Sequence, residues 1–509
     1  MILPSSILFC LIWVVFVSRQ VLARQLMNHT KQHATNSTVH YELVCQSDPI
    51  FCDKVDKAVA AAIDELTKVV NIKTSLLILV KYHSFCRKTC ANDTYGWGSP
   101  TSQFTLPFED GADLNYVYPQ ALAKQLAPYN STSVWAQYDV EIEINSDLYT
   151  NISDDPDEIN VGKYWFDDHT TEIAPEQIDF RYIVLHELLH GMGFLSAWAA
   201  YFWTKASPFR KLVDGVIDPL ELQLVTPGPY WFINQDTGPA YVTGFQHTMI
   251  FDKYLVNMNR ELNTTQTTLL SDIAMDMQNF CVSDNNAFIV NFLHAFNAAN
   301  QSTTAHKLWL SLSEPETLQF MFQPPHNHSQ FSRLPYLNQT YRNMTLLTGN
   351  DLFQVFYFEQ TDPTINRPGL MISHLDDQYQ NTVDFLMTQH YHMGQTLESL
   401  VQKFYQEIPV LQYNQSLPNG TLLQARYQSP IGPGILRVLD SIGYSTVLTS
   451  TSYTSDGNPK APRSRSICDD NTTNHNLKSG SVLTSMASIS LPSFYLIFLI
   501  YLCLQSNTV

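Results

Sequence analysis

The chain has 509 residues, with 29 basic and 47 acidic side chains that give a formal net charge of −18. Nucleic acids and anionic membrane faces are bound through basic patches, so this balance argues against both as main partners. Because 44% of the residues are hydrophobic and 12% aromatic, the chain can bury a large core, which excludes a disordered protein.

The N-terminal residues predict a secretory signal peptide. Residues 7–17 form an apolar run of secretory length, and residues 21–23 offer a cleavage point. No basic residue precedes the run, which departs from the usual pattern. We expect residues 1–23 to be removed and the protein to work outside the cell.

The C-terminal end predicts a glycolipid anchor. The apolar run Leu491–Leu504 is shorter than the about 20 residues that a membrane-spanning helix needs, and no Lys or Arg follows it. Small residues at 479–481 and a polar spacer precede the run, as in a cleaved anchor signal. We expect the anchor at Ser479, removal of residues 480–509, and a Ser/Thr/Asn-rich stalk over 446–479. A true transmembrane helix is the alternative.

Cysteines and asparagine sequons agree with a secreted route. Six cysteines lie in the expected mature chain, and an even number in an oxidising compartment predicts disulfides without choosing their pairing. The spacing of Cys86 and Cys90 could suit a metal clip, but a disulfide is the stronger interpretation. The density of Asn-x-Ser/Thr sequons predicts surface N-linked glycans, at Asn28, Asn36, Asn92, Asn130, Asn151, Asn263, Asn300, Asn327, Asn338, Asn343, Asn414, Asn419 and Asn471.

Hydrophobic spacing predicts helices and strands in an irregular order. The polar segment 24–44 is expected to be loose, and residues 196–371 are expected to be irregular apart from one helix. The predicted elements are a helix over 55–70, strands over 75–82 and 140–144, a helix from Pro175 to Gly191 or Gly193, and helices over 286–297 and 430–443. Strands and helices do not alternate regularly, so we predict an α+β fold and not a doubly wound sheet.

The motif that carries chemistry is HELLHGMGF at residues 186–194. On a helix, His186 and His190 project from one face with Cβ atoms about 5–6 Å apart. Their imidazoles can therefore hold two corners of a tetrahedral Zn²⁺, while Glu187 serves as general base toward an attacking water. The alternative is a chance HExxH on an amphipathic helix with both histidines packed or solvated, but an apolar run buries this helix and buried histidines need partners.

A catalytic zinc needs a third protein ligand and an open position. In the compact pattern HExxHxxGxxH, Gly193 is in place but Ser196 stands at the last histidine. Further along, His374 is followed by Leu386 and Met387, which is the order of third ligand and Met-turn in metzincins. The sequence therefore favours His374.

On these residues the chain resembles leishmanolysin, the glycolipid-anchored surface metzincin family, and secreted relatives that share an HELxHxxGF helix. The resemblance implies a metzincin-like zincin domain with a mixed sheet, an active-site helix and a long insertion before the third ligand. The implied parts are catalytic subdomains over 45–195 and 373–445 around an insertion over 196–372. The mature chain has fewer cysteines than leishmanolysins, so their disulfide pattern does not transfer.

The resemblance also implies roles for single residues. It assigns one Zn²⁺ to His186, His190 and His374, the general base to Glu187 and the hydrophobic floor beneath the zinc to Met387. The strand over 140–144 would be the edge strand that pairs with a polypeptide substrate.

Other residues stay open as ligands or helpers. Alternative third ligands are His247, Asp218, Glu221, and the pair His390 and His392. Tyr391 could polarise a substrate carbonyl, although a packed aromatic ring is the stronger interpretation. Asp252 is expected to order the insertion near the helix without a chemical role.

The expected function is that of a secreted or surface-anchored zinc metalloendopeptidase acting on polypeptides. The alternative is a non-catalytic, glycosylated coat or adhesion protein with a structural zinc site, and hydrolysis of a non-peptide amide also stays open. A closed structural site would have a fourth protein ligand, which separates it from an enzyme.

Overall fold

The computed structural model describes residues 28–34, 38–85, 94–106, 115–127, 134–150, 162–167, 172–203, 209–233, 240–258, 268–282, 287–324, 330–349, 371–416, 421–449 and 453. The predicted signal peptide, the anchor signal, most of the stalk and Ser479 lie outside these residues, as do Cys86, Cys90 and Cys468. Within the described ranges, no helix has the length and apolar content needed to cross a membrane.

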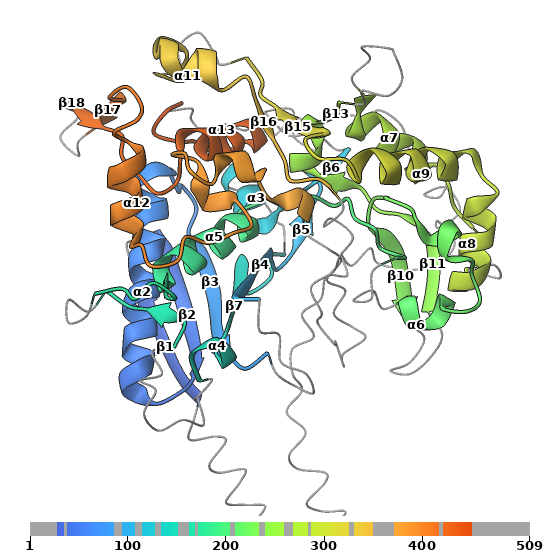
Figure 1. Ribbon diagram of the computed structural model, residues 1–509, viewed down its shortest axis with the longest axis horizontal. Helices are drawn as coiled ribbons and strands as arrows, with labels where there is room; N and C mark the ends of the chain where they lie inside the picture. The colour runs from blue at the N-terminus through green and yellow to red at the C-terminus, as the bar shows by residue number, and fades with distance from the viewer. Residues whose placement is uncertain are drawn as a thin grey trace, which may run out of the picture.

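A five-stranded mixed sheet organises the N-terminal part of the chain (Figure 1). Its order is β1 (Asn28–Ala34), β2 (Val39–Gln46), β3 (Leu76–His83), β7 (Val140–Asn145) and β4 (Gly96–Pro100). The three inner strands run parallel, and β1 and β4 pair antiparallel at the two edges. Along β2, β3 and β7, buried residues alternate with half-exposed ones over most of each strand, so one face of the sheet meets the core.

Two sequence predictions about this sheet were wrong. The segment 24–44 is not loose, because β1 and most of β2 lie in it; the polar residues of β2 alternate with buried Val39, Tyr41 and Leu43. The strand over 140–144 is not an edge, because β7 lies between β3 and β4. The edge strand β4 has the sequence GWGSP, which lacks the apolar alternation that marks a strand.

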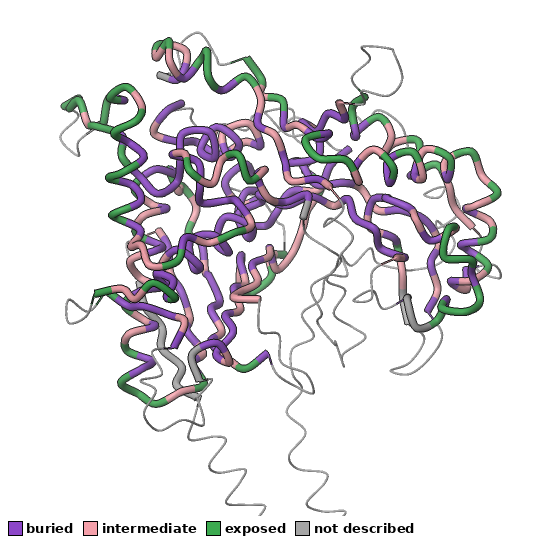
Figure 2. Tube along the Cα trace, in the orientation of Figure 1, coloured by how far each residue is buried: buried purple, intermediate pink, exposed green. Residues whose placement is uncertain are grey.

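Two helices cover the buried face of the sheet, and Figure 2 shows buried residues along both the strands and these helices. Helix α2 (Pro49–Val69) begins at the N-cap Asp48, and a disulfide between Cys45 and Cys52 joins it to β2. Helix α5 (Phe180–Gly191) packs against α2, β4 and β7. It begins after the N-cap Asp179, so Pro175 lies in a preceding turn and does not open the helix as predicted.

Short elements complete this part of the fold. They are α3 (Gln120–Leu126), α4 (Asp147–Thr150), β5 (Gln103–Phe104), β6 (Tyr116–Pro119), β8 (Tyr164–Trp165) and β9 (Ile178–Asp179). Strand β6 pairs in parallel with β12 (Thr248–Met249) of the insertion, so the two parts of the chain share a small sheet.

The insertion is more regular than the sequence predicted. Its helices are α6 (Arg210–Val213), η1 (Pro219–Leu222), η2 (Ile250–Tyr254), α7 (Leu270–Gln278), α8 (Ile289–Asn297), α9 (Asn300–Leu312), α10 (Gln330–Arg333) and α11 (Pro335–Thr340). Its strands are β10 (Pro229–Ile233), β11 (Ala240–Phe245), β13 (Leu255–Asn257), β14 (Thr268–Leu269), β15 (Leu318–Met321) and β16 (Asn343–Thr345). Helices α7 and α9 each bury only one face. The many polar residues on their other faces make the apolar periodicity hard to recognise in the sequence.

The chain then returns to the first subdomain. It forms η5 (Met371–Ser373), η6 (Asp377–Tyr379), η7 (Phe385–Met387), α12 (Leu397–Phe404), the hairpin β17 (Gln412–Ser416) and β18 (Leu422–Arg426), and α13 (Pro433–Ile442). The fold continues beyond the predicted boundary at 445, because Leu448 is buried and Thr446 forms a β-bridge with Val70.

Candidate metal centre

The two histidines of HELLHGMGF lie on the buried helix α5. Eleven of its twelve residues are buried, all but Arg181, so His186, Glu187 and His190 point into protein and not into bulk water. The helix ends at the predicted glycines. Gly193 has φ +112°, and a Cβ there would lie 2.8 Å from Pro119 Cγ, so both the turn and the packing require glycine.

The third histidine, His374, lies in a segment that is far from α5 in the sequence. His374 follows η5, and its carbonyl accepts the Leu347 N–H at 2.9 Å, while the next residue, Leu375, donates its N–H to Met387 O at 2.8 Å. Met387 is fully buried in η7. The segment that contains the predicted Met-turn therefore holds the backbone beside His374 in place.

The ring nitrogens of the three histidines converge. His186 Nε2 lies 3.1 Å from His190 Nε2 and 3.3 Å from His374 Nε2. Bonds of about 2.0–2.1 Å at tetrahedral angles would separate the ligand nitrogens of a zinc ion by about 3.3–3.4 Å. Two of the three spacings therefore match one Zn²⁺, and all three ligand nitrogens lie within 4.8 Å of one another.

Backbone carbonyls determine which nitrogen of each helix histidine faces the cluster. His186 Nδ1 lies 2.7 Å from Leu386 O, and His190 Nδ1 lies 2.8 Å from Phe194 O. A carbonyl only accepts, so both Nδ1 atoms carry the hydrogen and both Nε2 atoms present a lone pair, as metal ligation requires. Burial and the neighbouring His190 and His374 lower the pKa of His186, and burial lowers the pKa of His190 to about 4, so both rings stay neutral at neutral pH.

Glu187 lies beside the cluster and against the edge strand β4. Burial raises the pKa of its carboxyl to about 8, while hydrogen bonds from the Tyr391 hydroxyl and the Gly98 N–H oppose the shift. A Cβ on Gly96 would lie 2.9 Å from Glu187 Cγ. Two glycines of β4 thus provide the space that the Glu187 side chain and backbone occupy.

Asp252 holds the loop after α5 in place through hydrogen bonds, in agreement with the prediction that it orders the insertion near the helix. The Asp252 carboxylate is buried and accepts hydrogen bonds from the Ser196 hydroxyl (2.6 Å), Ala197 N–H (3.0 Å) and Met249 N–H (2.8 Å). The Ser196 N–H in turn donates to Ser373 Oγ at 3.0 Å, next to His374. Ser196, which stands where the compact motif has its last histidine, therefore connects Asp252 to Ser373 and has a structural role.

The alternative ligands lie elsewhere. Of the described residues, His186, His190 and His374 form the one group of His, Cys, Asp and Glu that could hold a metal. Asp218 caps η1, His390 lies 3.7 Å from Asp377, and His392 Nε2 contacts Gln380 O at 2.7 Å. His247 does not join the group either.

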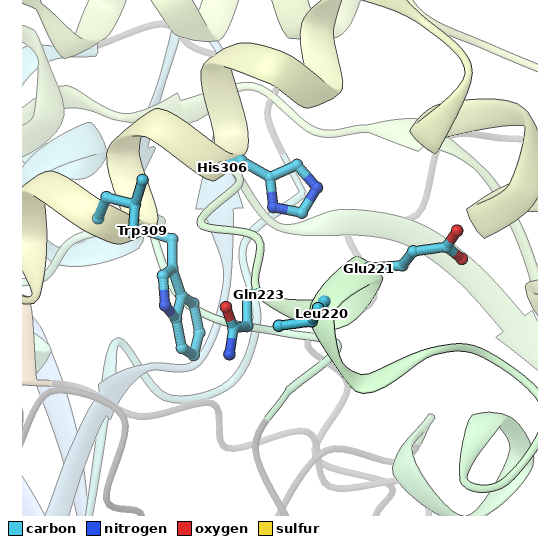
Figure 3. A pocket seen from close by; sticks show the side chains of 6 residues that line it. Leu220, Glu221, Gln223, His306 and Trp309 are labelled. Carbon is cyan, nitrogen blue, oxygen red and sulfur yellow. The ribbon is translucent and has the colours of Figure 1, made fainter.

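Glu221 lines a separate cavity of about 310 Å³ between η1 and α9. Figure 3 shows its side chain across this cavity from Trp309, with His306 between them on α9. This cavity belongs to the insertion and contains none of the three clustered histidines.

Comparison with known proteins assigns the chain to a family. The SPBPB7E8-like family model matches residues 14–462, a range that includes all three histidines. The chain belongs to the SPBPB7E8-like family. It is also 24% identical over 164 residues to the uncharacterized protein PB7E8.01 of Schizosaccharomyces pombe, a match that covers 30% of this chain and 26% of that protein. The chain thus spans about a quarter of that relative. No solved structure matches.

Sequence reasoning missed Gly96 and Gly98, and it did not predict the contact of Tyr391 with Glu187, in the site of this SPBPB7E8-like protein. Gly96 and Gly98 carried no signal beyond two glycines in a short segment, and their contact with Glu187 depends on how β4 packs on α5. The Tyr391 hydroxyl lies 3.4 Å from Glu187 Oε1, so the ring is packed as predicted but its polar end reaches the predicted base.

Proposed function

We propose that the protein is a secreted or surface-anchored zinc metalloendopeptidase built on a metzincin-like zincin fold resembling leishmanolysin. The observation that supports this most directly is the convergence of three Nε2 atoms at 3.1 and 3.3 Å beside a buried glutamate. Three histidines with an adjacent carboxylate form the donor set of catalytic zinc sites.

Several residues of the chain have separate roles in the proposed reaction. Zn²⁺ held by His186, His190 and His374 would supply a Lewis acid and lower the pKa of a bound water to about 7. Glu187 accepts a proton from the attacking water and passes it to the leaving amine. The Leu386 and Phe194 carbonyls keep His186 and His190 in the tautomer that exposes Nε2.

A polypeptide substrate would pair with β4 and not with β7, the strand first expected. Among the described strands, β4 pairs with β7 alone and lies at the edge of the sheet, which is where an extended chain adds to a sheet. Because Gly96 and Gly98 contact Glu187, a chain along β4 would pass close to the base. This arrangement favours peptides over smaller amides.

The rival function is a coat or adhesion protein with a structural zinc site. A structural site is closed by a fourth protein ligand, and no fourth His, Cys, Asp or Glu joins the cluster among the described residues.

The proposed extracellular route agrees with the exposure of three sequon asparagines. Glycans could be attached at these exposed residues, which are Asn300, Asn338 and Asn414.

The deciding experiment measures zinc content and casein cleavage for the secreted protein and its Glu187→Gln variant. We expect one zinc ion per chain in both, with chelator-sensitive cleavage only in the parent. Zinc in both without cleavage in either would favour the coat protein. Absence of zinc from both would refute the metal site.

A further inference from the structure

Tyr391 is held in one position by rings that surround it. Its ring centroid lies 5.0 Å from that of Tyr182 and 5.3 Å from that of Tyr95, both edge-on, and 5.3 Å from the His186 ring. Contacts on three sides fix where its hydroxyl group lies. That hydroxyl is 3.4 Å from Glu187 Oε1.

The same carboxylate oxygen lies close to β4. A Cβ on Gly96 would come within 3.0 Å of Glu187 Oε1, and the Gly98 N–H donates to the carboxylate. Tyr391 and β4 therefore both lie against the Glu187 carboxyl group, Tyr391 from the tyrosine cluster and β4 from the sheet edge. A glutamate turns freely about its terminal bond unless a partner selects one orientation. The hydrogen bond from the Tyr391 hydroxyl to Oε1 selects such an orientation.

We propose that Tyr391 is a positioning residue: its hydroxyl donates to Glu187 Oε1 and orients the carboxylate for proton transfer. This role acts through Glu187 and requires no contact between Tyr391 and substrate. It rests on the proposed peptidase function, which gives Glu187 a proton to transfer. A ring that served only for packing would need no hydroxyl at this place.

The physical reason for a rate effect is preorganisation. A base held in one orientation loses no free energy to reorientation in the transition state, and displacement by about 1 Å can cost about 100-fold in rate. Removing a group that orients a metal ligand typically costs about 10–100-fold in affinity or activity, and we expect a loss of the same order for a group that orients the base. Packing of the ring on Tyr182 and Tyr95 uses only carbon atoms, so phenylalanine preserves it.

The test compares Tyr391→Phe with the matched control Tyr164→Phe. Tyr164 is a buried tyrosine of the same aromatic cluster, but its hydroxyl donates to Asn145 O at 2.6 Å and not to Glu187. We expect Tyr391→Phe to keep its zinc and its KM for a peptide substrate and to lose about 10–100-fold in kcat. The control should retain the parent kcat.

A second measurement does not depend on turnover. A peptide hydroxamate chelates zinc and hydrogen-bonds to a neighbouring carboxylate, so its affinity reports the position of Glu187. We expect Tyr391→Phe and Glu187→Gln each to weaken the binding of the hydroxamate. The loss of affinity in Tyr391→Phe should be about tenfold. In the Glu187→Gln background the second substitution should add little, because both act on one interaction.

The outcomes separate the two proposals. Unchanged kcat and hydroxamate affinity in Tyr391→Phe would refute the positioning role and leave the peptidase intact. Weakened hydroxamate binding with no cleavage by the parent would show that Tyr391 orients Glu187 but would refute the peptidase, and with it the role in proton transfer. Loss of zinc from Tyr391→Phe would show a structural role instead and overturn the inference.

Discussion

Gly98 on the edge strand lies directly against the backbone of Glu187. A Cβ at position 98 would come within 1.9 Å of the Glu187 carbonyl oxygen, far inside van der Waals contact. Because the obstacle is backbone of a buried helix, it cannot rotate aside. The position of β4, along which we place the substrate, is therefore coupled to the position of the proposed base.

Gly98→Ala should separate β4 from α5. Forcing a methyl group into a packed contact costs about 1–3 kcal/mol of unfolding free energy, and the strand must move to accept it. Urea denaturation measures the stability, and casein cleavage should fall with it. Ser99→Ala is the control, since Ser99 is the next residue of the same strand. Parent-like stability and activity in Gly98→Ala would contradict this contact.

His374→Ala should lose zinc affinity. Changes beside a metal ligand typically cost about 10–100-fold, so loss of a ligand should exceed about 100-fold. Competition with a chromogenic chelator measures the affinity. His390→Ala is the matched control, because His390 lies in the same segment with its side chain 61% exposed and 3.7 Å from Asp377. Retained zinc stoichiometry and turnover in His374→Ala would remove His374 from the site.

Asp252→Ala should destabilise the loop that follows α5. The substitution leaves the partly buried N–H of Ala197 and the buried N–H of Met249 without their acceptor, and loss of the acceptor of a buried N–H costs about 1–3 kcal/mol. Asp252→Asn retains an oxygen acceptor and should cost less. Thermal unfolding measures both variants, with the exposed Asp272→Ala as control. Equal midpoints for Asp252→Ala and Asp272→Ala would show that the carboxylate does not hold the loop.

Asp384 should make stability depend on pH. Its buried carboxylate accepts the Gly434 and Ile435 N–H groups at the start of α13 and the Tyr341 hydroxyl. Burial raises its pKa from 3.8 to about 6. Between these values the unfolded chain has released a proton that the folded chain keeps, so stability falls as pH rises.

This shift in the pKa of Asp384 should lower the free energy of unfolding by roughly 3 kcal/mol between about pH 4 and pH 6. Asp384→Asn mimics the protonated form and should lack this change. Urea unfolding of both proteins at several pH values measures the difference, which isolates Asp384 from other titrating groups. A difference that stays constant with pH would contradict the assigned shift.

Features that depend on near neighbours in the chain could be predicted from the sequence. The four-residue spacing of His186 and His190 places both on one helix face whatever surrounds them, because helical geometry is local. The same holds for the buried strand β3 and the apolar helix α13, whose periods are visible in the sequence. The expected order of third ligand and Met-turn then favoured His374, although the sequence contained no information on its distance from the helix.

Only the tertiary structure decided which distant residues meet. His374 joins the helix histidines through the backbone pairing of η7, and Gly98 and Tyr391 reach Glu187 from a sheet edge and a ring cluster. The same packing made β4, and not β7, the edge of the sheet. A periodic pattern specifies which face of an element is buried, whereas its neighbour is selected by the packing of the whole core, which no local pattern encodes.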